Sequence, residues 1–364
     1  MLLTGAQIGL AMGIYQLIGA VTQPGFGWLT DKIGSRWIGP VSVAWMAGFM
    51  TLSVLVAQFT NSFPLFLIFF SLTAFGIGAF HPQGTMHAGT AIASRAATGT
   101  AIFFLFGQTG LSLGPVLSGL LLDNVGAIGI FVLALLSTPI LIFITFAMRH
   151  SGPQPVSPSV RSDGKQMTTG EAVRWNAIGL LAVIMGLRSW AFLGTVSFLP
   201  KMFQNMGWEA SAYGLITGAF WFASGISGVI AGHLADRWGR RPIVFGTMLV
   251  GSIPLLFLPL TSSWLAFPLA MIFGAFGGAS HSILVVIAQA LLPGRKALAS
   301  GITLGYIFGM GAFSTWAIGA MADVWGLTLV IQASAVVGVL TAFLALFLPA
   351  TREATHPEPE RVPA

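Results

Sequence analysis

The feature that most constrains this chain is a series of long apolar runs, each about as long as a helix that crosses a bilayer. A transmembrane helix needs about 20 predominantly apolar residues. Only 7% of the residues are charged and 55% are hydrophobic, whereas about a quarter of a soluble domain is charged. We therefore predict an all-α membrane protein with eleven spans, at about 7–29, 37–58, 64–90, 97–122, 127–148, 175–199, 211–234, 242–260, 264–290, 298–322 and 328–348.

The basic residues indicate how the chain is oriented in the membrane. Of the 16 Lys and Arg residues, 14 fall in the loops and ends of one side, Lys201 falls on the other side, and Arg188 lies inside a span. Cytoplasmic loops carry an excess of Lys and Arg. We expect a multi-pass protein of the cytoplasmic membrane with a cytoplasmic C-terminus and with Met1 outside. This clustering in loops, with no basic stripe, argues against nucleic-acid binding despite the net charge of +6.

The spans fall into two halves that repeat each other. Residues 1–148 form a predicted bundle of five spans and residues 175–349 one of six, joined by a polar linker at 149–174 and followed by a polar tail at 350–364 that we expect to be disordered. The segment 27–36 recurs at 232–241, and His81 and Arg95 recur as His281 and Arg295. Parallel repeats of this kind build transporters whose solute site lies between the halves.

The two copies of this repeated loop carry a recognisable motif. Segment 232–241 resembles the Gly-x-Leu-Ala-Asp-Arg-x-Gly-Arg-Arg signature of the major facilitator superfamily at every fixed position, and 27–36 is a looser copy. An Asp that pairs with basic groups at a tight turn can act as a latch between helices, and the complete copy predicts a larger role for Asp236 than for Asp31. The alternative is a loop with a surface ion pair. The loop residues are Gly27, Asp31, Gly34, Arg36, Gly232, Asp236, Arg237, Gly239, Arg240 and Arg241.

The fourth predicted span contains a second motif of small residues. Gly110, Gly114, Pro115 and Gly119 resemble the Gly-x-x-x-Gly-Pro-x-x-Gly-Gly element of major facilitator antiporters, with Ser118 in place of one glycine. Small residues let helices approach closely, and proline removes a helical hydrogen bond. Ordinary glycine-rich packing is the alternative interpretation.

Further segments resemble one branch of the superfamily, the fosmidomycin-resistance proteins. They are Phe80-His81-Pro82, the run 288–295 that includes Gln289, and the segment 308–311. The resemblance implies efflux of a drug driven by proton entry. This chain departs from the branch at Gln83, where an acidic residue is expected, so the identity of the drug does not transfer. Gln83 and Gln289 are candidate residues for substrate binding or coupling.

Arg188 is the one basic residue deep inside a predicted span. It lies 13 residues after Trp175 and 11 before Leu199, which is about 16–20 Å from either end of a helix. An arginine at the centre of a span costs about 2.5–3.5 kcal/mol on insertion scales. We expect Arg188 to face a central cavity and bind an anionic substrate or counter-ion. The alternative is a structural partner for a carbonyl or a histidine.

Two histidines are candidates for carrying protons. His81 and His281 each precede a basic loop residue by 14 positions, and His titrates near neutral pH. All ten Asp and Glu residues fall in predicted loops or in the tail, so no carboxylate lies at mid-membrane in this chain. The alternative role for each histidine is hydrogen-bonded packing.

These patterns favour a secondary active transporter that exports a drug-like or anionic solute, with protons as the coupling ion. Uptake of an organic anion or nutrient by a facilitator or symporter, and a receptor that has lost transport, remain alternatives. The chain has no cysteine, no nucleotide-binding loop and no cluster of metal ligands or catalytic residues. We therefore expect no enzyme activity, no cofactor, no metal and no nucleotide, and a monomer in the bilayer with a small-molecule substrate.

The two halves differ in one respect that the repeat does not explain. The loop with Asp236 follows two spans of its half, but the loop with Asp31 follows only one. We therefore expect that the equivalent of the first helix precedes Met1. Such a helix, starting in the cytoplasm, would also agree with the charge distribution.

Overall fold

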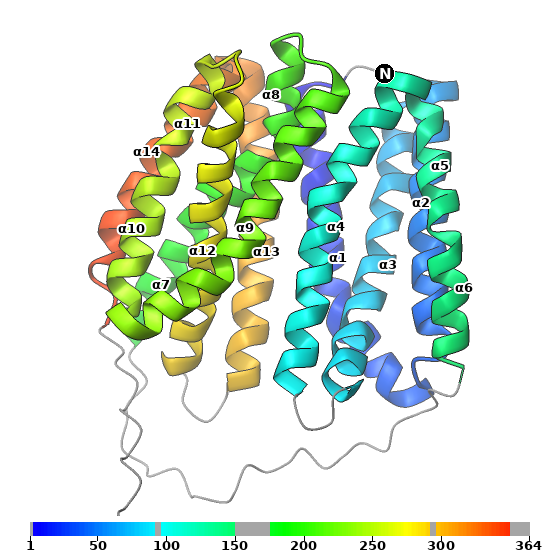
Figure 1. Cartoon of the computed structure of the whole chain (residues 1–364), viewed down its shortest axis with the longest axis horizontal. Coiled ribbons are helices and arrows are strands. Elements are labelled where there is room, and N and C mark those ends of the chain that lie inside the picture. Colours follow the sequence, from blue (N-terminus) through cyan, green and yellow to red (C-terminus); the bar gives the residue numbers. More distant parts are fainter. Residues whose placement is uncertain (1–2, 92–95, 150–174, 292–295, 350–364) are drawn as a thin grey trace, which may run out of the picture.

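The computed structural model describes residues 3–91, 96–149, 175–291 and 296–349, and these residues are almost entirely helical (Figure 1). Within them, ten helices are long and apolar enough to cross a membrane. The all-α membrane fold is therefore confirmed. The linker at 150–174 and the tail at 350–364 lie outside the described residues.

The first half is built from four long helices, two short ones and one 3-10 turn. Their bounds are α1 (Gly5–Ile33), α2 (Ile38–Thr60), α3 (Phe63–Ala91), α4 (Ala96–Val125), η1 (Gly126–Ile128), α5 (Gly129–Leu136) and α6 (Thr138–Ala147). The predicted span 127–148 is broken at Ser137, because Pro139 in the first turn of α6 has no N–H to continue the helix. For this reason the predicted count of eleven spans is not confirmed.

The second half contains the other long helices and several interruptions. Its elements are α7 (Trp175–Arg188), the π-helical segment η2 (Ser189–Gly194), α8 (Leu199–Asn205), α9 (Ala210–Trp238), α10 (Arg240–Ser252), α11 (Pro254–Phe257), η3 (Leu258–Leu260), α12 (Ala266–Leu291), α13 (Lys296–Trp325) and α14 (Leu327–Ala345). Prolines again mark breaks, since Pro254 begins α11 and Pro259 lies within η3. Most of the buried apolar core belongs to this half.

The helices repeat between the halves in the order that the sequence predicts. The counterparts of α1, α2, α3 and α4 are α9, α10, α12 and α13. Among the described residues of the first half, none forms a counterpart of α7. The predicted helix upstream of Met1 stays a prediction.

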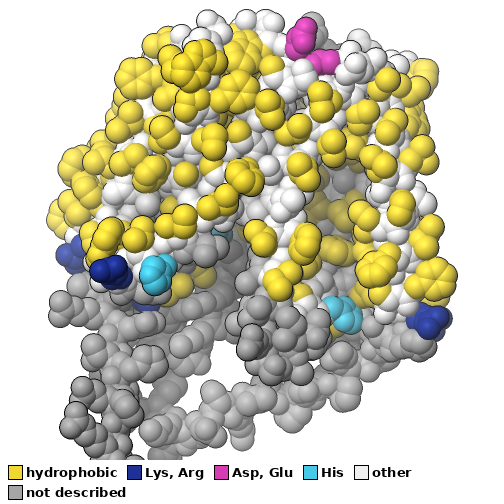
Figure 2. Space-filling view, in the orientation of Figure 1, with side chains coloured by type: hydrophobic (Ala, Val, Ile, Leu, Met, Phe, Trp, Pro, Cys, Tyr) yellow, Lys and Arg dark blue, Asp and Glu magenta, His cyan; other side chains and the backbone are white. Residues whose placement is uncertain are grey.

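The two ends of the helix bundle differ in charge (Figure 2). We call the end that carries Lys32, Arg36, Arg237, Arg240 and Arg241 the basic end, and the end that carries Asp123, Glu209 and Asp323 the acidic end. In Figure 2 the dark-blue side chains lie at the lower edge and the magenta ones at the top. Exposed apolar side chains cover the surface between them, as expected for a surface in contact with lipid.

The turns at the basic end explain two glycines of the repeated loop. Gly34 and Gly239 have φ angles of 81° and 91°, in a region that only glycine adopts without strain. Their backbone N–H groups donate to Thr30 O at 2.8 Å and to Ala235 O at 2.9 Å, which caps the ends of α1 and α9. A side chain at either position would strain this turn.

Candidate transport site and the contacts between the halves

Arg188 is the last residue of α7, and its side chain is buried within the second half. The side chain is 6% exposed. Its Nε donates to Ser280 Oγ at 2.9 Å and its Nη2 donates to Gly277 O at 2.7 Å, both on α12. These acceptors are neutral, so they satisfy donors of the guanidinium without neutralising its charge.

The backbone directly after Arg188 is also unusual. The segment η2 is π-helical, and such bulges often occur at functional sites. Two hydrogen bonds tie it to α13, because Ser189 Oγ donates to Ile307 O at 3.1 Å and Ser314 Oγ donates to Ser189 O at 3.3 Å. Contacts with α12 and α13 therefore hold Arg188 and the segment after it in place. The pattern of apolar residues in the sequence does not predict these contacts.

The two candidate histidines lie in different surroundings. His281 directly follows Ser280, the partner of Arg188, and lies within electrostatic range of the guanidinium. His81 lies on α3 of the first half, where its exposed ring meets Phe103 of α4 edge-on at 6.2 Å between ring centroids and 83° between planes. His281 thus belongs to the surroundings of Arg188, and His81 belongs to the opposite half.

The glutamine candidates do not extend this site. Gln83 is 1% exposed, and neither polar atom of its amide has a hydrogen-bond partner. Its Nε2 lies 3.3 Å from the position that a Cβ on Gly39 of α2 would take, so the side chain packs inside the first half. The side chain of Gln289 lies outside the described residues.

The residues at the basic end make contacts within their own half. Ser35 Oγ and His87 Nε2 are hydrogen-bonded at 2.5 Å. Arg36 lies over the ring of Trp37 at 5.1 Å, and the Nε of Arg241 donates to Leu348 O at 2.7 Å. The side chains of Asp31 and Asp236 lie outside the described part of the structure, so the latch proposed for these loops remains a prediction.

The other loop residues are distributed around the same turns. Arg240 is buried, with 8% exposure, whereas Arg237 is exposed. A Cβ on Gly27 would lie 3.7 Å from Pro82, an ordinary contact, and one on Gly232 would meet nothing within 4 Å. The space at these two positions therefore does not require glycine in this conformation.

The halves touch through two helix pairs, α4 with α9 and α1 with α13, which lie side by side in Figure 1. We call these contacts the α4–α9 seam and the α1–α13 seam. In the α4–α9 seam a Cβ on Gly119 or Gly214 would collide with the backbone of the opposite helix, and one on Gly218 would lie 2.5 Å from Ser112 O. Ser112 Oγ also donates to Gly218 O at 3.0 Å. Small residues therefore let α4 and α9 approach closely.

The α1–α13 seam repeats this arrangement. A Cβ on Gly5, Gly9 or Gly13 would lie 2.6–2.8 Å from a backbone oxygen of α13. The positions correspond by the sequence repeat, since Gly9 and Gly13 are the counterparts of Gly214 and Gly218. The two halves thus meet through two equivalent glycine contacts.

The close contacts of both seams lie in the acidic-end half of α4 and α13. On α4 they run from Gln108, 3.2 Å from the position of a Cβ on Gly225, to Gly119 beside Ala210. On α13 they run from Gly311, where a Cβ would lie 3.1 Å from Gln16 Oε1, to Gly319 beside Gly5. Figure 2 shows the surface hollowed between the halves on the basic side.

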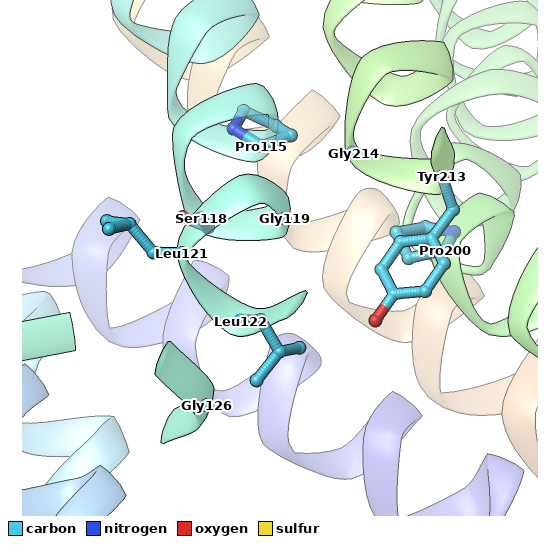
Figure 3. Close-up of a pocket in the computed structure, with 9 residues that line it drawn as sticks. All are labelled: Pro115, Ser118, Gly119, Leu121, Leu122, Gly126, Pro200, Tyr213 and Gly214. Atoms are coloured by element: carbon cyan, nitrogen blue, oxygen red, sulfur yellow. The ribbon is translucent and has the colours of Figure 1, made fainter. Parts of the chain in front are cut away.

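A small cavity opens beside the α4–α9 seam at the acidic end (Figure 3). Its volume is about 230 Å³, and its walls come from α4, η1, α8 and α9. In Figure 3, Tyr213 and Pro200 lie across from Gly119 and Leu122 of α4. The lining is mostly apolar and contains neither Arg188 nor a histidine, so this cavity is separate from the surroundings of Arg188.

A bundle of two repeated halves, with signature turns at one end and an arginine buried at depth, defines a membrane transporter. Residues 2–209 and 178–364 each match the Major Facilitator Superfamily, and together they cover almost all of the chain. The chain belongs to this superfamily.

Individual relatives agree with this assignment. The fosmidomycin resistance protein of Escherichia coli (strain K12) is 29% identical over 357 residues, which is 96% of this chain and 86% of that protein. The uncharacterized MFS-type transporter YfnC of Bacillus subtilis (strain 168) is 29% identical over 363 residues, which is 97% of this chain and 86% of the relative. YdeG of the same organism, also an uncharacterized MFS-type transporter, is 25% identical over 307 residues, covering 80% and 67%. The 29% identity to the fosmidomycin resistance protein confirms the resemblance to the fosmidomycin-resistance branch.

Proposed function

We propose that this protein is a secondary active transporter that exports a small anionic, drug-like solute. Arg188 carries this proposal, because it is a buried guanidinium whose hydrogen-bond partners, Ser280 and Gly277, are both neutral. A cation at this depth in a membrane protein is a functional-site hypothesis by default. An anionic substrate would supply the compensating charge, and a relative named for resistance to a drug supports the direction of export.

The seams support transport by alternating access. Their close contacts lie in the acidic-end half of the helices, which is the arrangement expected of one state of a rocking transporter. With the basic end in the cytoplasm, as its Lys and Arg residues suggest, this state receives solute from inside the cell. Rocking of the halves would then close the basic end and open the acidic end.

Protons are the proposed coupling ion, and the histidines are the proposed carriers. All Asp and Glu residues of the chain lie at helix ends, in loops or in the tail, so a carboxylate relay at mid-membrane is absent from this sequence. His281, beside the partner of Arg188, and His81, on the equivalent helix of the other half, titrate in the physiological range when unperturbed. Protonation of His281 would then be coupled electrostatically to binding of an anion at Arg188.

Uptake of an organic anion is the second candidate, because Arg188 would serve an importer equally well. The two functions are separated by the effect of expression on drug sensitivity. Cells that lack their own efflux systems would be exposed to a panel of antibiotics that includes fosmidomycin and other phosphonates. Export predicts a higher inhibitory concentration for at least one anionic compound, and import predicts a lower one. Unchanged sensitivity across the anionic compounds would count against the proposal.

A further inference from the structure

Two aspartates at the acidic end bind across the boundary between the halves. Asp123 at the end of α4 accepts hydrogen bonds from Ala210 N at 2.9 Å and Ser211 N at 2.7 Å, the first two residues of α9. Asp323 at the end of α13 accepts hydrogen bonds from Gly5 N at 2.6 Å and Ala6 N at 2.7 Å, the first two residues of α1. Each carboxylate thus caps the N-terminus of a helix in the opposite half.

The two caps are equivalent by the internal repeat. Asp123 and Asp323 are separated by 200 residues, which is the offset of α4 and α13, and Gly5 and Ala210 by 205, which is the offset of α1 and α9. A carboxylate at a helix N-terminus gains from charge-assisted hydrogen bonds and from the helix dipole. Because the same geometry occurs in both seams, it is a property of the duplicated architecture.

These caps coincide with the closed part of each seam. Gly119 lies one turn before Asp123 and contacts Ala210, and Gly319 lies one turn before Asp323 and contacts Gly5. Separation of α4 from α9 at the acidic end would therefore break both hydrogen bonds of Asp123 at once. Four backbone N–H groups at the two helix N-termini would lose their partners from the opposite half.

We propose that Asp123 and Asp323 form a two-point gate that holds the acidic end closed and is released when the transporter opens to that side. This inference rests on the proposed transport cycle. It assigns a role to two carboxylates that lie outside the signature loops and away from Arg188. The gate also gives a physical reason for the closed acidic end, because its hydrogen bonds add to the close packing of helices at small residues.

The two points of the gate are unequal. Helix α1 has a cap of its own, because Thr4 Oγ1 accepts from Gln7 N at 3.2 Å in a capping box. At the start of α9, the N-cap residue Glu209 makes no side-chain cap hydrogen bond. The α9 terminus therefore depends on Asp123 more than the α1 terminus depends on Asp323, so loss of Asp123 should open the gate further.

Thiol labelling tests the gate directly, because the natural chain has no cysteine. Ser112→Cys and Ala312→Cys place single thiols at equivalent positions of the two seams. A membrane-impermeant maleimide, added only on the acidic-end side and without substrate, reports opening as a labelling rate. Losing a charge-assisted cap should raise the population open to this side by about tenfold. We expect Asp123→Asn to raise labelling by about this factor, and Asp323→Asn to raise it by less.

Two further variants distinguish loss of the hydrogen bonds to Asp123 from a general loss of negative charge at the acidic end. Glu209→Gln removes an acidic charge at the same end and should leave labelling unchanged. Ala210→Pro removes one donor to Asp123 while keeping the carboxylate, and proline suits the first position of a helix; it should raise labelling as Asp123→Asn does.

A buried reference position completes the test. Ser334 on α14 is 0% exposed, so a thiol at this position should stay unlabelled in every variant. Parental labelling rates in Asp123→Asn and Ala210→Pro, or an equal rise at Ser334, would overturn the assignment. Because the assay uses no solute, absence of transport would refute the proposed function and leave the labelling result intact.

Discussion

Arg188→Ala should leave the protein folded and weaken binding of the anionic solute. Removing the buried charge relieves a cost of about 2.5–3.5 kcal/mol, whereas losing two charge-assisted hydrogen bonds costs about 1.5–3 kcal/mol each. Ser280 Oγ also donates to Gly277 O at 3.1 Å, so the two acceptors stay bonded to each other after the guanidinium is gone. The gains offset most of the losses, and we expect a net loss of stability of at most about 3.5 kcal/mol.

The effect on transport should appear as weaker binding of the solute. An anion that loses a charge-assisted contact of about 1.5–3 kcal/mol binds about ten- to a hundredfold more weakly. Efflux of a labelled anionic antibiotic from loaded cells, together with thermal unfolding of the purified protein, separates the two effects. Arg188→Lys keeps the charge and should retain part of the activity, and Ser280→Ala should cost less than Arg188→Ala. Parental efflux by Arg188→Ala would refute the role of this residue.

Two further predictions concern coupling and the seams. The double variant His81→Gln and His281→Gln should lose the pH dependence of transport measured between pH 5.5 and 8, because no Asp or Glu of the printed sequence falls at the middle of a span. An unchanged pH profile would place the proton route elsewhere. Gly9→Ala places a Cβ 2.6 Å from Thr315 O. Overpacking costs about 1–3 kcal/mol of free energy and hinders closure of the acidic end, so efflux should fall by about tenfold. Its control is Gly25→Ala on the same helix, where a Cβ meets nothing within 4 Å; equal efflux by the two alanine variants would contradict the importance of the seam.

The sequence predicts the membrane fold well because hydropathy and length dominate the choice of structure in lipid. Eight of the eleven apolar runs correspond to one helix each, and the run expected at about 7–29 corresponds to α1 (Gly5–Ile33). The runs 127–148, 175–199 and 242–260 are interrupted. Within lipid, backbone groups must be satisfied inside the segment, so few alternatives to a helix exist. The interruptions at Pro139 and Pro254 were not predicted, because a proline in an apolar run either kinks or breaks the helix depending on tertiary packing.

The sequence predicts the depth of Arg188 along its span but not the contacts of its side chain. The depth of Arg188 follows from counting residues along one span. Its partners Ser280 and Gly277 lie about 90 residues further along the chain, and nothing local in the sequence links them to it. The π-helical turn after Arg188 likewise depends on contacts with α13, which a single apolar run does not reveal.

The sequence likewise predicts where Asp123 and Asp323 lie along their helices but not which residues they contact. The repeat analysis aligns Asp123 with Asp323, and the sequence places both at helix ends. Their function depends on which helix begins opposite each carboxylate, and only the packing of α4 on α9 and of α1 on α13 shows that. An internal repeat with matched acidic residues at helix ends could have marked them as candidates.

The most direct test of export by this protein is the steady-state accumulation of a labelled anionic antibiotic, such as fosmidomycin, in cells that lack other efflux systems. Cells with the parental protein should accumulate less antibiotic than cells with equal amounts of Arg188→Ala in the membrane. This difference should disappear when a protonophore collapses the proton gradient. Equal accumulation in the two strains, or higher accumulation with the parental protein, would contradict proton-driven export through Arg188.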